Sequence, residues 1–198
     1  MPPPNRKPLH TRQITCTGYL RDDGLIDVEA ELKDISPDGT HLLFKEVPPG
    51  GAIHHMHVSA TIDMDLVIRD ITARMAAGPS DICPEIEPAY GALKGVALRT
   101  GFRQAVKARV GGVKGCTHMT DLLGPMATTA VQSRFSLDRA ARNGRLPADE
   151  AGPMPRPALV GTCHTYRIDS RAVAILWPPH RRLNNEDADG SAGAEVSG

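Results

Sequence analysis

The chain has 198 residues, of which 40% are hydrophobic, 23% are charged and only 4% are aromatic. Lysine and arginine together number 23, as do aspartate and glutamate, so the formal net charge is zero. This balance excludes the basic surface typical of nucleic-acid-binding proteins and offers no attraction to an anionic membrane. No apolar run approaches the roughly 18 residues of a membrane span, and MPPPNRKPLH lacks the apolar core of a signal peptide, which together predict a cytoplasmic location.

Two β-hairpins are predicted in the first part of the chain. Residues 12–35 alternate between apolar and polar on both sides of Asp22-Asp23-Gly24, and Asp-Gly between two alternating runs is a strong hairpin signal. Residues 53–75 alternate in the same way around a turn at Met64-Asp65, and Gly78-Pro79 then breaks the strand.

Helices are predicted in the middle of the chain, at residues 85–94, at residues 101–110 and after Gly115. The last and longest of them has an apolar stripe at helical spacing, formed by Met119, Leu122, Leu123, Met126, Ala127, Ala130 and Val131. Gly124-Pro125 lies inside this stripe. Because proline removes a backbone donor, we expect a kink or a restart of the helix there.

The remaining segments complete the predicted domain. Residues 143–158 are predicted to be an internal linker loop, residues 159–178 a third hairpin that returns to the sheet, and residues 1–9 and 179–198 disordered tails. Strands followed by helices and again by strands predict an α+β fold, in which an antiparallel β-sheet of hairpins has helices packed on one face. We expect a single domain over residues 10–178, with a sheet edge that could pair in a homodimer.

The strongest candidate for a reactive site is GVKGCTH, which precedes the longest predicted helix. A thiol at a helix N-terminus lies near unpaired N–H groups and the positive end of the helix dipole, and both favour the thiolate. Cys116 and His118 are therefore candidate catalytic residues. The alternative is structural: Thr117 caps the helix, Cys116 is a small buried residue and His118 is an ordinary surface residue.

A metal site assembled from distant segments is a second interpretation. Cys83, Cys116, Cys163 and His54 are the candidate ligands, and sulfur and imidazole ligands suit Zn or Fe. The chain has no C-x-x-C motif, so a self-contained zinc knuckle is excluded. On a strand, His55 and His57 would share a face at a spacing that can also chelate one metal, although exposed histidines on a strand are often only solvated.

Several blocks of the sequence resemble a bacterial family known as domain of unknown function 2889. They are LHTRQITCTGYLRDDGLIDVEAELKD, HHMHVSATIDMDLVIRDITARM, GVKGCTHMTDLL and GTCHTYRIDSRAVAILWP, and the resemblance spans residues 9–178. It implies no established activity. It does imply a His-Asp-Met triplet at the start of the second hairpin, which here reads His54-His55-Met56. The resemblance therefore favours His54 as a site residue and implies that any role of the aspartate is altered.

These observations leave three hypotheses for function. The chain could be a metal-dependent enzyme of lyase or hydrolase type, in which three protein ligands leave the metal an open position. It could instead be a thiol enzyme that acts on a small molecule through Cys116, with His118 or His54 as partner. The alternative to both is a non-catalytic accessory protein that binds a small ligand or a metal.

Overall fold

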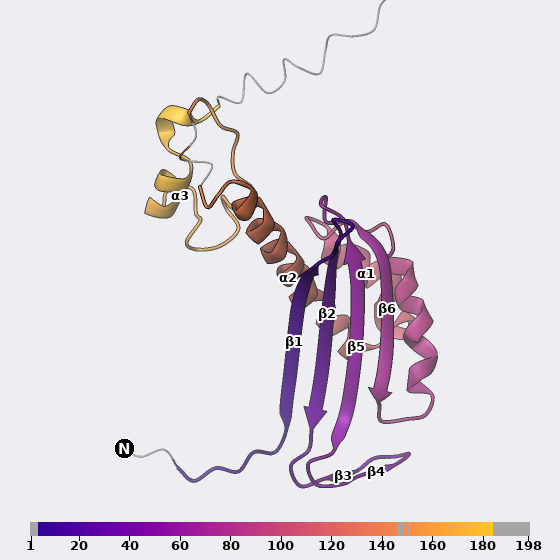
Figure 1. Ribbon diagram of the computed structural model, residues 1–198. Coiled ribbons are helices and arrows are strands. Elements are labelled where there is room, and N and C mark those ends of the chain that lie inside the picture. Colours follow the sequence, from indigo (N-terminus) through magenta and orange to yellow (C-terminus); the bar gives the residue numbers. More distant parts are fainter. Residues whose placement is uncertain (1–3, 146–148, 150, 184–198) are drawn as a thin grey trace, which may run out of the picture. The chain divides into compact units, whose positions relative to one another are not determined.

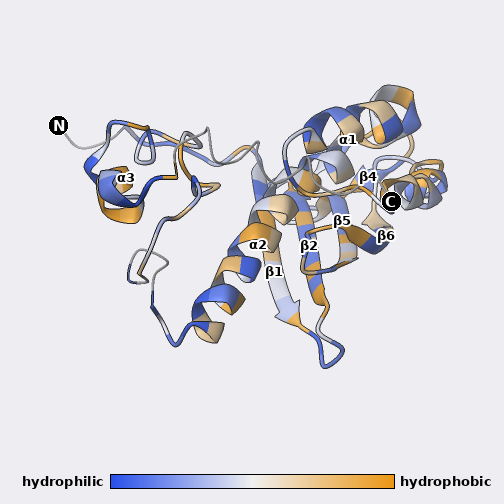
Figure 2. Ribbon diagram, turned by 90° about the horizontal axis from the view of Figure 1, so that it is seen from above, coloured by the Kyte–Doolittle hydropathy of each residue, from blue (hydrophilic) through white to orange (hydrophobic). Residues whose placement is uncertain are grey.

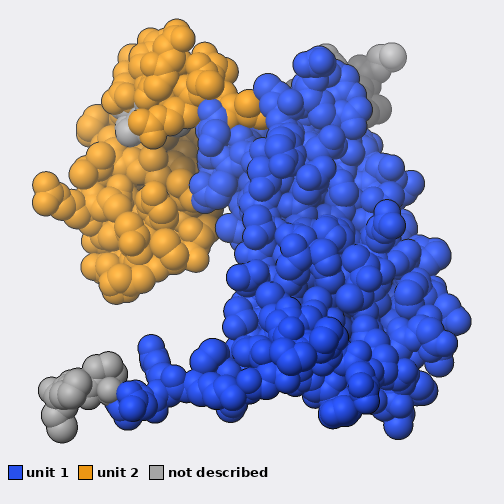
Figure 3. Space-filling model, turned by 60° about the horizontal axis from the view of Figure 1, so that its bottom comes forward, with its two compact units in different colours: residues 1–136 blue, residues 137–198 orange. Residues whose placement is uncertain are grey.

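The computed structural model describes residues 4–145, 149 and 151–183, and the chain divides into two compact units, residues 1–136 and 137–198 (Figure 3). The predicted single domain over residues 10–178 extends across this division. Most of the predicted C-terminal tail, residues 184–198, lies outside the described residues.

A four-stranded antiparallel sheet forms the first unit (Figure 1). Its strands follow the order β1-β2-β5-β6, and their bounds are Thr11–Leu20, Ile26–Ile35, Ala52–Ile62 and Ile68–Ala77. The two predicted hairpins are therefore confirmed, and they pair with each other through β2 and β5. A short two-stranded ribbon, β3 (Thr40–His41) with β4 (Glu46–Val47), lies in the connection between them.

One face of this sheet is covered by helices and the other is open (Figure 1). Strand residues alternate between the faces, so the covered face of β2 presents Ile26, Val28, Ala30 and Leu32, all at most 3% exposed. The helices on this face are 3-10 helix η1 (Cys83–Leu93), α1 (Phe102–Val110) and α2 (Thr117–Ala141). Hydrophobic and hydrophilic residues alternate along both α-helices (Figure 2), as expected of helices packed on a sheet. The predicted α+β fold class is thus confirmed.

Helix α2 continues through its proline. It runs unbroken over Thr117–Ala141, so the helix does not restart at Pro125, and a kink there, the other expected outcome, stays a prediction. A proline inside a helix costs about 3 kcal/mol. Leu122, Leu123 and Met126 flank it and are at most 4% exposed, and burying one such side chain contributes about 1.5–3 kcal/mol. Packing on the sheet therefore offsets the lost hydrogen bond.

The second unit contains no strand within its described residues, so the predicted third hairpin at 159–178 is wrong. That segment forms turns and the short helix α3 (Arg171–Leu176). Ser170 caps α3 by accepting a hydrogen bond from the Val173 N–H at 3.1 Å. Val173 and Trp177 are four residues apart, a helical spacing that the apparent alternation of this segment concealed.

A small apolar cluster stabilises the second unit. Its buried members are Met154, Val160, Val173 and Trp177, and Tyr166 packs against them. The Trp177 indole N–H also donates to the Met154 carbonyl at 3.1 Å. Met154 belongs to the predicted linker loop, which therefore contributes a core residue. Residues Pro179–Arg181 form a 3-10 turn, η4, so regular structure continues into the predicted tail.

Candidate functional site

Three polar residues form a row across one end of the sheet. Arg12 on β1 pairs in register with Asp34 on β2, and Asp34 pairs with His54 on β5. All three continue the alternation that places apolar residues on the covered face. Asp34 consequently occupies a position equivalent to the buried leucines and valines of β2, and its side chain is only 1% exposed.

The Asp34 carboxylate is the centre of a hydrogen-bond network. Arg12 grips it with two bonds, from Nε to Oδ1 and from Nη2 to Oδ2, both 2.8 Å long. His10 Nε2 lies 3.2 Å from Oδ1, and His54 Nδ1 lies 3.0 Å from Oδ2. The hydrogen bonds from Arg12 hold the pKa of Asp34 well below its usual range, although burial opposes the effect. Because an ionised carboxylate can only accept, His54 carries its proton on Nδ1.

His118 approaches this row from the start of α2. Its ring stacks on the ring of His54, with the centroids 3.7 Å apart and the planes inclined by 26°. Its Nε2 lies 3.9 Å from Asp34 Oδ2. Burial lowers the pKa of both imidazoles. The pKa of His54 is lowered further by any positive charge on the His118 ring, and that of His118 by the Arg12 guanidinium. Both rings are thus favoured in the neutral form, which can accept a proton.

Cys116 lies near the other ring nitrogen of His118, Nδ1. Its Sγ is 3.9 Å from His118 Nδ1. The Cys116 carbonyl accepts the first helical bond, from the Thr120 N–H at 2.9 Å, so Cys116 itself occupies the cap position expected for Thr117. Buried Tyr90 holds the same residue: its hydroxyl accepts from the Cys116 N–H at 3.1 Å and donates to the Cys116 carbonyl at 2.9 Å. The thiol is therefore held by a rigid main chain.

Gly115 explains why glycine precedes this cysteine. A Cβ at this position would lie 2.1 Å from the carbonyl oxygen of Val110, which is main chain and cannot rotate away. The tight packing directs the chain from the end of α1 into α2. Gly115 thus has a packing role.

An open pocket of about 520 Å³ adjoins the thiol. Cys83 and Cys116 both line it, together with Met75, Ile82, Glu85, Ile86, Gly115 and Thr117. The two cysteines come from the starts of η1 and α2. The volume of the pocket lies in the range of small-molecule sites.

The structure brings together only part of the predicted site. Cys116, His118 and His54 converge, and Cys83 shares the pocket with Cys116. Cys163 lies in the second unit, where its side chain is exposed, and it stays a predicted ligand only. Cys16 lies on the covered face of β1 with its thiol pKa raised by burial, which fits a core residue.

Sequence reasoning missed Asp34, Arg12 and Tyr90. A signal for Asp34 was present: it continues the phase of Ile26, Val28, Ala30 and Leu32, so a carboxylate stood at a core position of the predicted strand. A buried carboxylate requires partners. That requirement pointed to the basic residues in the same phase of the neighbouring strands, Arg12 and His54.

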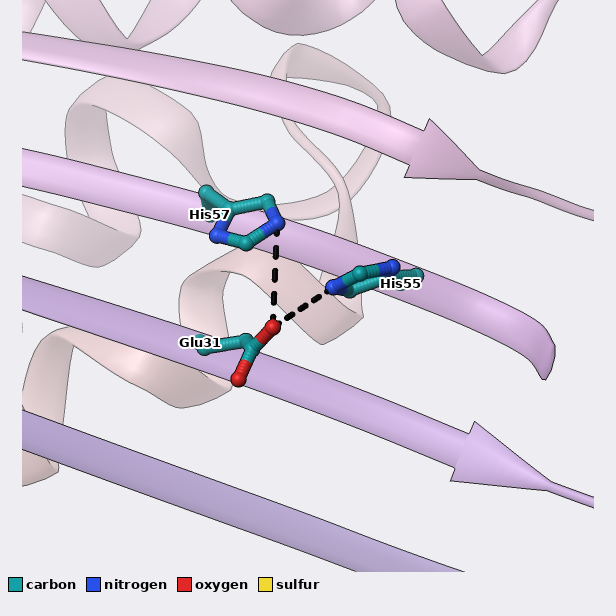
Figure 4. A group of neighbouring side chains, drawn as sticks. All are labelled: Glu31, His55 and His57. Carbon is teal, nitrogen blue, oxygen red and sulfur yellow. Dashed lines mark hydrogen bonds and ion pairs between the residues drawn. The ribbon is translucent and has the colours of Figure 1, made fainter.

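Two groups of described residues have donor atoms close enough to hold a metal ion. One is Asp34, His54 and His118, and the other is Glu31, His55 and His57 on the open face of the sheet; in each, all donor atoms lie within 4.8 Å of one another (Figure 4 shows the second). In the first group both Asp34 oxygens already accept from Arg12. A metal there would compete with the guanidinium for the lone pairs of these oxygens.

Comparison with known proteins identifies the family. The family described as protein of unknown function (DUF2889) matches residues 10–132. The chain belongs to this family. The match covers the sheet, η1, α1 and the first part of α2, and it ends before GTCHTYRIDSRAVAILWP, so the resemblance inferred for that block lies outside the matched residues. No curated protein and no solved structure matches the chain.

The family match includes every residue of the Cys116–His118–Asp34 group. His55, which stands where the resemblance implies an aspartate, faces away from that group, because adjacent strand residues point to opposite faces. The altered residue therefore belongs to the open face. Among the described residues, the structure has no helix with both the length and the apolar character needed to cross a bilayer.

Proposed function

We propose that this protein is a thiol-dependent enzyme that acts on a small organic molecule through Cys116. The observation that supports this most strongly is the order of three groups: the Cys116 thiol, the His118 imidazole and the buried Asp34 carboxylate, with 3.9 Å at each step. This is the order of nucleophile, base and orienting carboxylate found in hydrolytic triads. Both distances are long for hydrogen bonds, as is common before a substrate is bound.

Each residue has a defined role in this proposal. Asp34 favours the His118 tautomer with its proton on Nε2, which leaves Nδ1 free to accept the thiol proton. The start of α2 stabilises the resulting thiolate through its free N–H groups and dipole. His54, fixed by Asp34 and stacked on His118, holds the imidazole in place and keeps its own Nε2 available as a second acid–base group.

A hydrolytic reaction suits this arrangement. The thiolate attacks an electrophilic carbonyl carbon, the leaving group departs with the proton held by His118, and a thioester forms on Cys116. Water, deprotonated by the same imidazole, then attacks the thioester and releases the acid and the thiol. The pocket beside Cys116 supports a small substrate, since Met75, Ile82 and Ile86 offer apolar contact and Glu85 a single charge.

The experiment that tests the proposal is thiol alkylation as a function of pH. Each cysteine is followed by peptide mass spectrometry with iodoacetamide, and the rate at pH 7 is divided by the rate at pH 10 to cancel differences in access. We expect a higher ratio for Cys116 than for exposed Cys163, because the start of α2 and the neighbouring imidazole of His118 favour the thiolate. His118→Gln should lower the ratio for Cys116 and leave Cys163 unchanged. Equal ratios in the unaltered chain would refute the proposal.

A second candidate function is metal binding by Asp34, His54 and His118. Two imidazoles and one carboxylate are a ligand set used by zinc and by non-haem iron, and their donor atoms cluster here. This candidate comes second because the two hydrogen bonds from Arg12 already engage both Asp34 oxygens. Anaerobic purification with elemental analysis separates the two: this candidate expects bound Zn or Fe that His54→Ala removes and Cys116→Ser retains.

The proposal includes a cytoplasmic location and a possible homodimer. All four cysteines are free thiols in the structure, which suits the reducing cytoplasm. Strand β1 pairs only with β2 among the described residues, so its outer edge could pair in a homodimer.

A further inference from the structure

The open face of the sheet carries a second imidazole–carboxylate group, formed by Glu31, His55 and His57 (Figure 4). Glu31 on β2 lies directly opposite His57 on β5, and His55 is two residues earlier on β5. Because alternate strand residues share a face, all three side chains project from the same side. This side is opposite to the one that holds Asp34 and Cys116, so the group is independent of the proposed enzyme site.

The geometry of the three side chains suits a shared cation. His55 Nε2 lies 2.7 Å and His57 Nε2 3.9 Å from the same oxygen of Glu31, Oε1. The two rings are tilted by 49° with centroids 4.6 Å apart, so both direct Nε2 towards the carboxylate rather than stacking. Zinc–ligand bonds measure about 2.0–2.2 Å, and the donor atoms of the three side chains all lie within 4.8 Å of one another.

The charges around the group show what a cation must displace. Lys33 Nζ lies 2.7 Å from Glu31 Oε1, and this contact, followed by that of His55, lowers the pKa of Glu31 to about 2. Glu31 is thus ionised and already attracts a cation. Lys33 is 36% exposed and flexible, so it can turn into solvent when a metal arrives. Arg74, which pairs with His57 across β5 and β6, adds a further positive charge.

We propose that Glu31, His55 and His57 form a surface site for a zinc-class divalent cation. Two imidazole nitrogens and one carboxylate oxygen are ligands that Zn²⁺ prefers over Mg²⁺ or Ca²⁺, which favour all-oxygen sites. The group is partly exposed, with side chains 24–44% accessible, so an ion can enter without local unfolding. Three protein ligands leave at least one position for water or for a group from a bound molecule.

Calorimetric titration of the full chain with Zn²⁺ at pH 7.5 tests this site. The affinity should fall at least about tenfold in His55→Ala and in His57→Ala, and should fall also in Glu31→Gln, since each variant loses a ligand. Lys33→Ala should bind several-fold more tightly because it removes the competitor for Glu31. His118→Ala, which alters the other group, is the matched control and should retain the affinity.

A second measurement identifies the residues in contact with the metal. Substoichiometric Ni²⁺ should broaden the ring proton resonances of His55 and His57 before those of other histidines. Far-UV circular dichroism confirms that each variant keeps its sheet. Absence of Zn²⁺ binding, or binding that the His55 and His57 variants retain and His118→Ala abolishes, would overturn the proposal and leave the proposed thiol chemistry untouched.

Discussion

Replacing Asp34 by asparagine tests the network on which the candidate site depends. The amide keeps the size of the carboxylate but has one acceptor oxygen and one donor group, whereas Arg12 offers donors to both oxygens. One favourable contact therefore becomes a donor–donor contact, and the buried charge that balances the guanidinium is lost. The substitution should consequently lower both stability and the order of the site.

The expected loss follows from the burial of the pair. Removing one partner of a buried ion pair costs about 3–5 kcal/mol, and a hydrogen bond to a charged group contributes about 1.5–3 kcal/mol. Asp34 is 1% exposed, but Arg12 is 37% exposed and keeps its contact with Asp121. Since the guanidinium can regain some hydration, we expect a loss of about 2–3 kcal/mol in the free energy of unfolding at pH 7.

The pH dependence provides an independent check. The pKa of Asp34 is depressed in the folded chain, so its contribution is complete above the unfolded pKa of about 3.9 and is lost as the pH falls towards the folded value. The difference between the original chain and Asp34→Asn should accordingly be largest near neutral pH and should shrink below about pH 4.

The assay must report on the sheet. The single tryptophan, Trp177, belongs to the second unit, so its fluorescence does not follow the sheet. Urea unfolding by far-UV circular dichroism, with amide hydrogen exchange of β2 and β5 peptides, is the suitable measurement. Asp121→Asn is the matched control: Asp121 also contacts Arg12, at 3.0 Å, but is 52% exposed, and its loss should cost less than about 1 kcal/mol. Equal stability of Asp34→Asn and the original chain at pH 7 would refute the reasoning.

Two further substitutions test how the cysteine is held. Tyr90→Phe removes the hydroxyl that is hydrogen-bonded to the Cys116 main chain. Because the Cys116 N–H loses its partner, the free energy of unfolding in urea should fall by about 1–3 kcal/mol. An unchanged unfolding midpoint would contradict this role of Tyr90. Gly115→Ala places a methyl group against a main-chain carbonyl and should cost about 1–3 kcal/mol. Gly18→Ala meets side-chain atoms instead, the Ser133 hydroxyl at 2.1 Å and the Ser133 Cβ at 3.2 Å, of which the hydroxyl can rotate away. It should therefore melt closer to the original chain, and the reverse order in thermal melts would contradict the packing argument.

The sequence by itself determined the sheet. Strict alternation over ten-residue runs, interrupted by Asp22-Asp23-Gly24, has few other interpretations, and both hairpins formed as predicted. The helix at Phe102–Val110 could also be predicted from the sequence, because its apolar residues recur at helical spacing. These patterns are local, and each reflects one element with one buried side.

Short or mixed patterns were not decisive without tertiary contacts. Residues 159–178 alternate enough to suggest strands, yet Ser170 and Trp177 bound a six-residue helix whose buried side faces Met154. Pro125 should break a helix in isolation, but burial of its neighbours against the sheet keeps α2 continuous. In both cases the free energy of packing exceeded the local preference.

The candidate site likewise could be predicted only in part from the sequence. Cys116, His118 and His54 could be selected from the sequence because their chemistry is visible in the residue types. Their meeting with Asp34 could not, since it requires the register of β1, β2 and β5 and the docking of the start of α2 on that end of the sheet. A sequence records which groups are available, whereas distances between groups far apart along the chain are set only when the apolar faces of sheet and helices pack together.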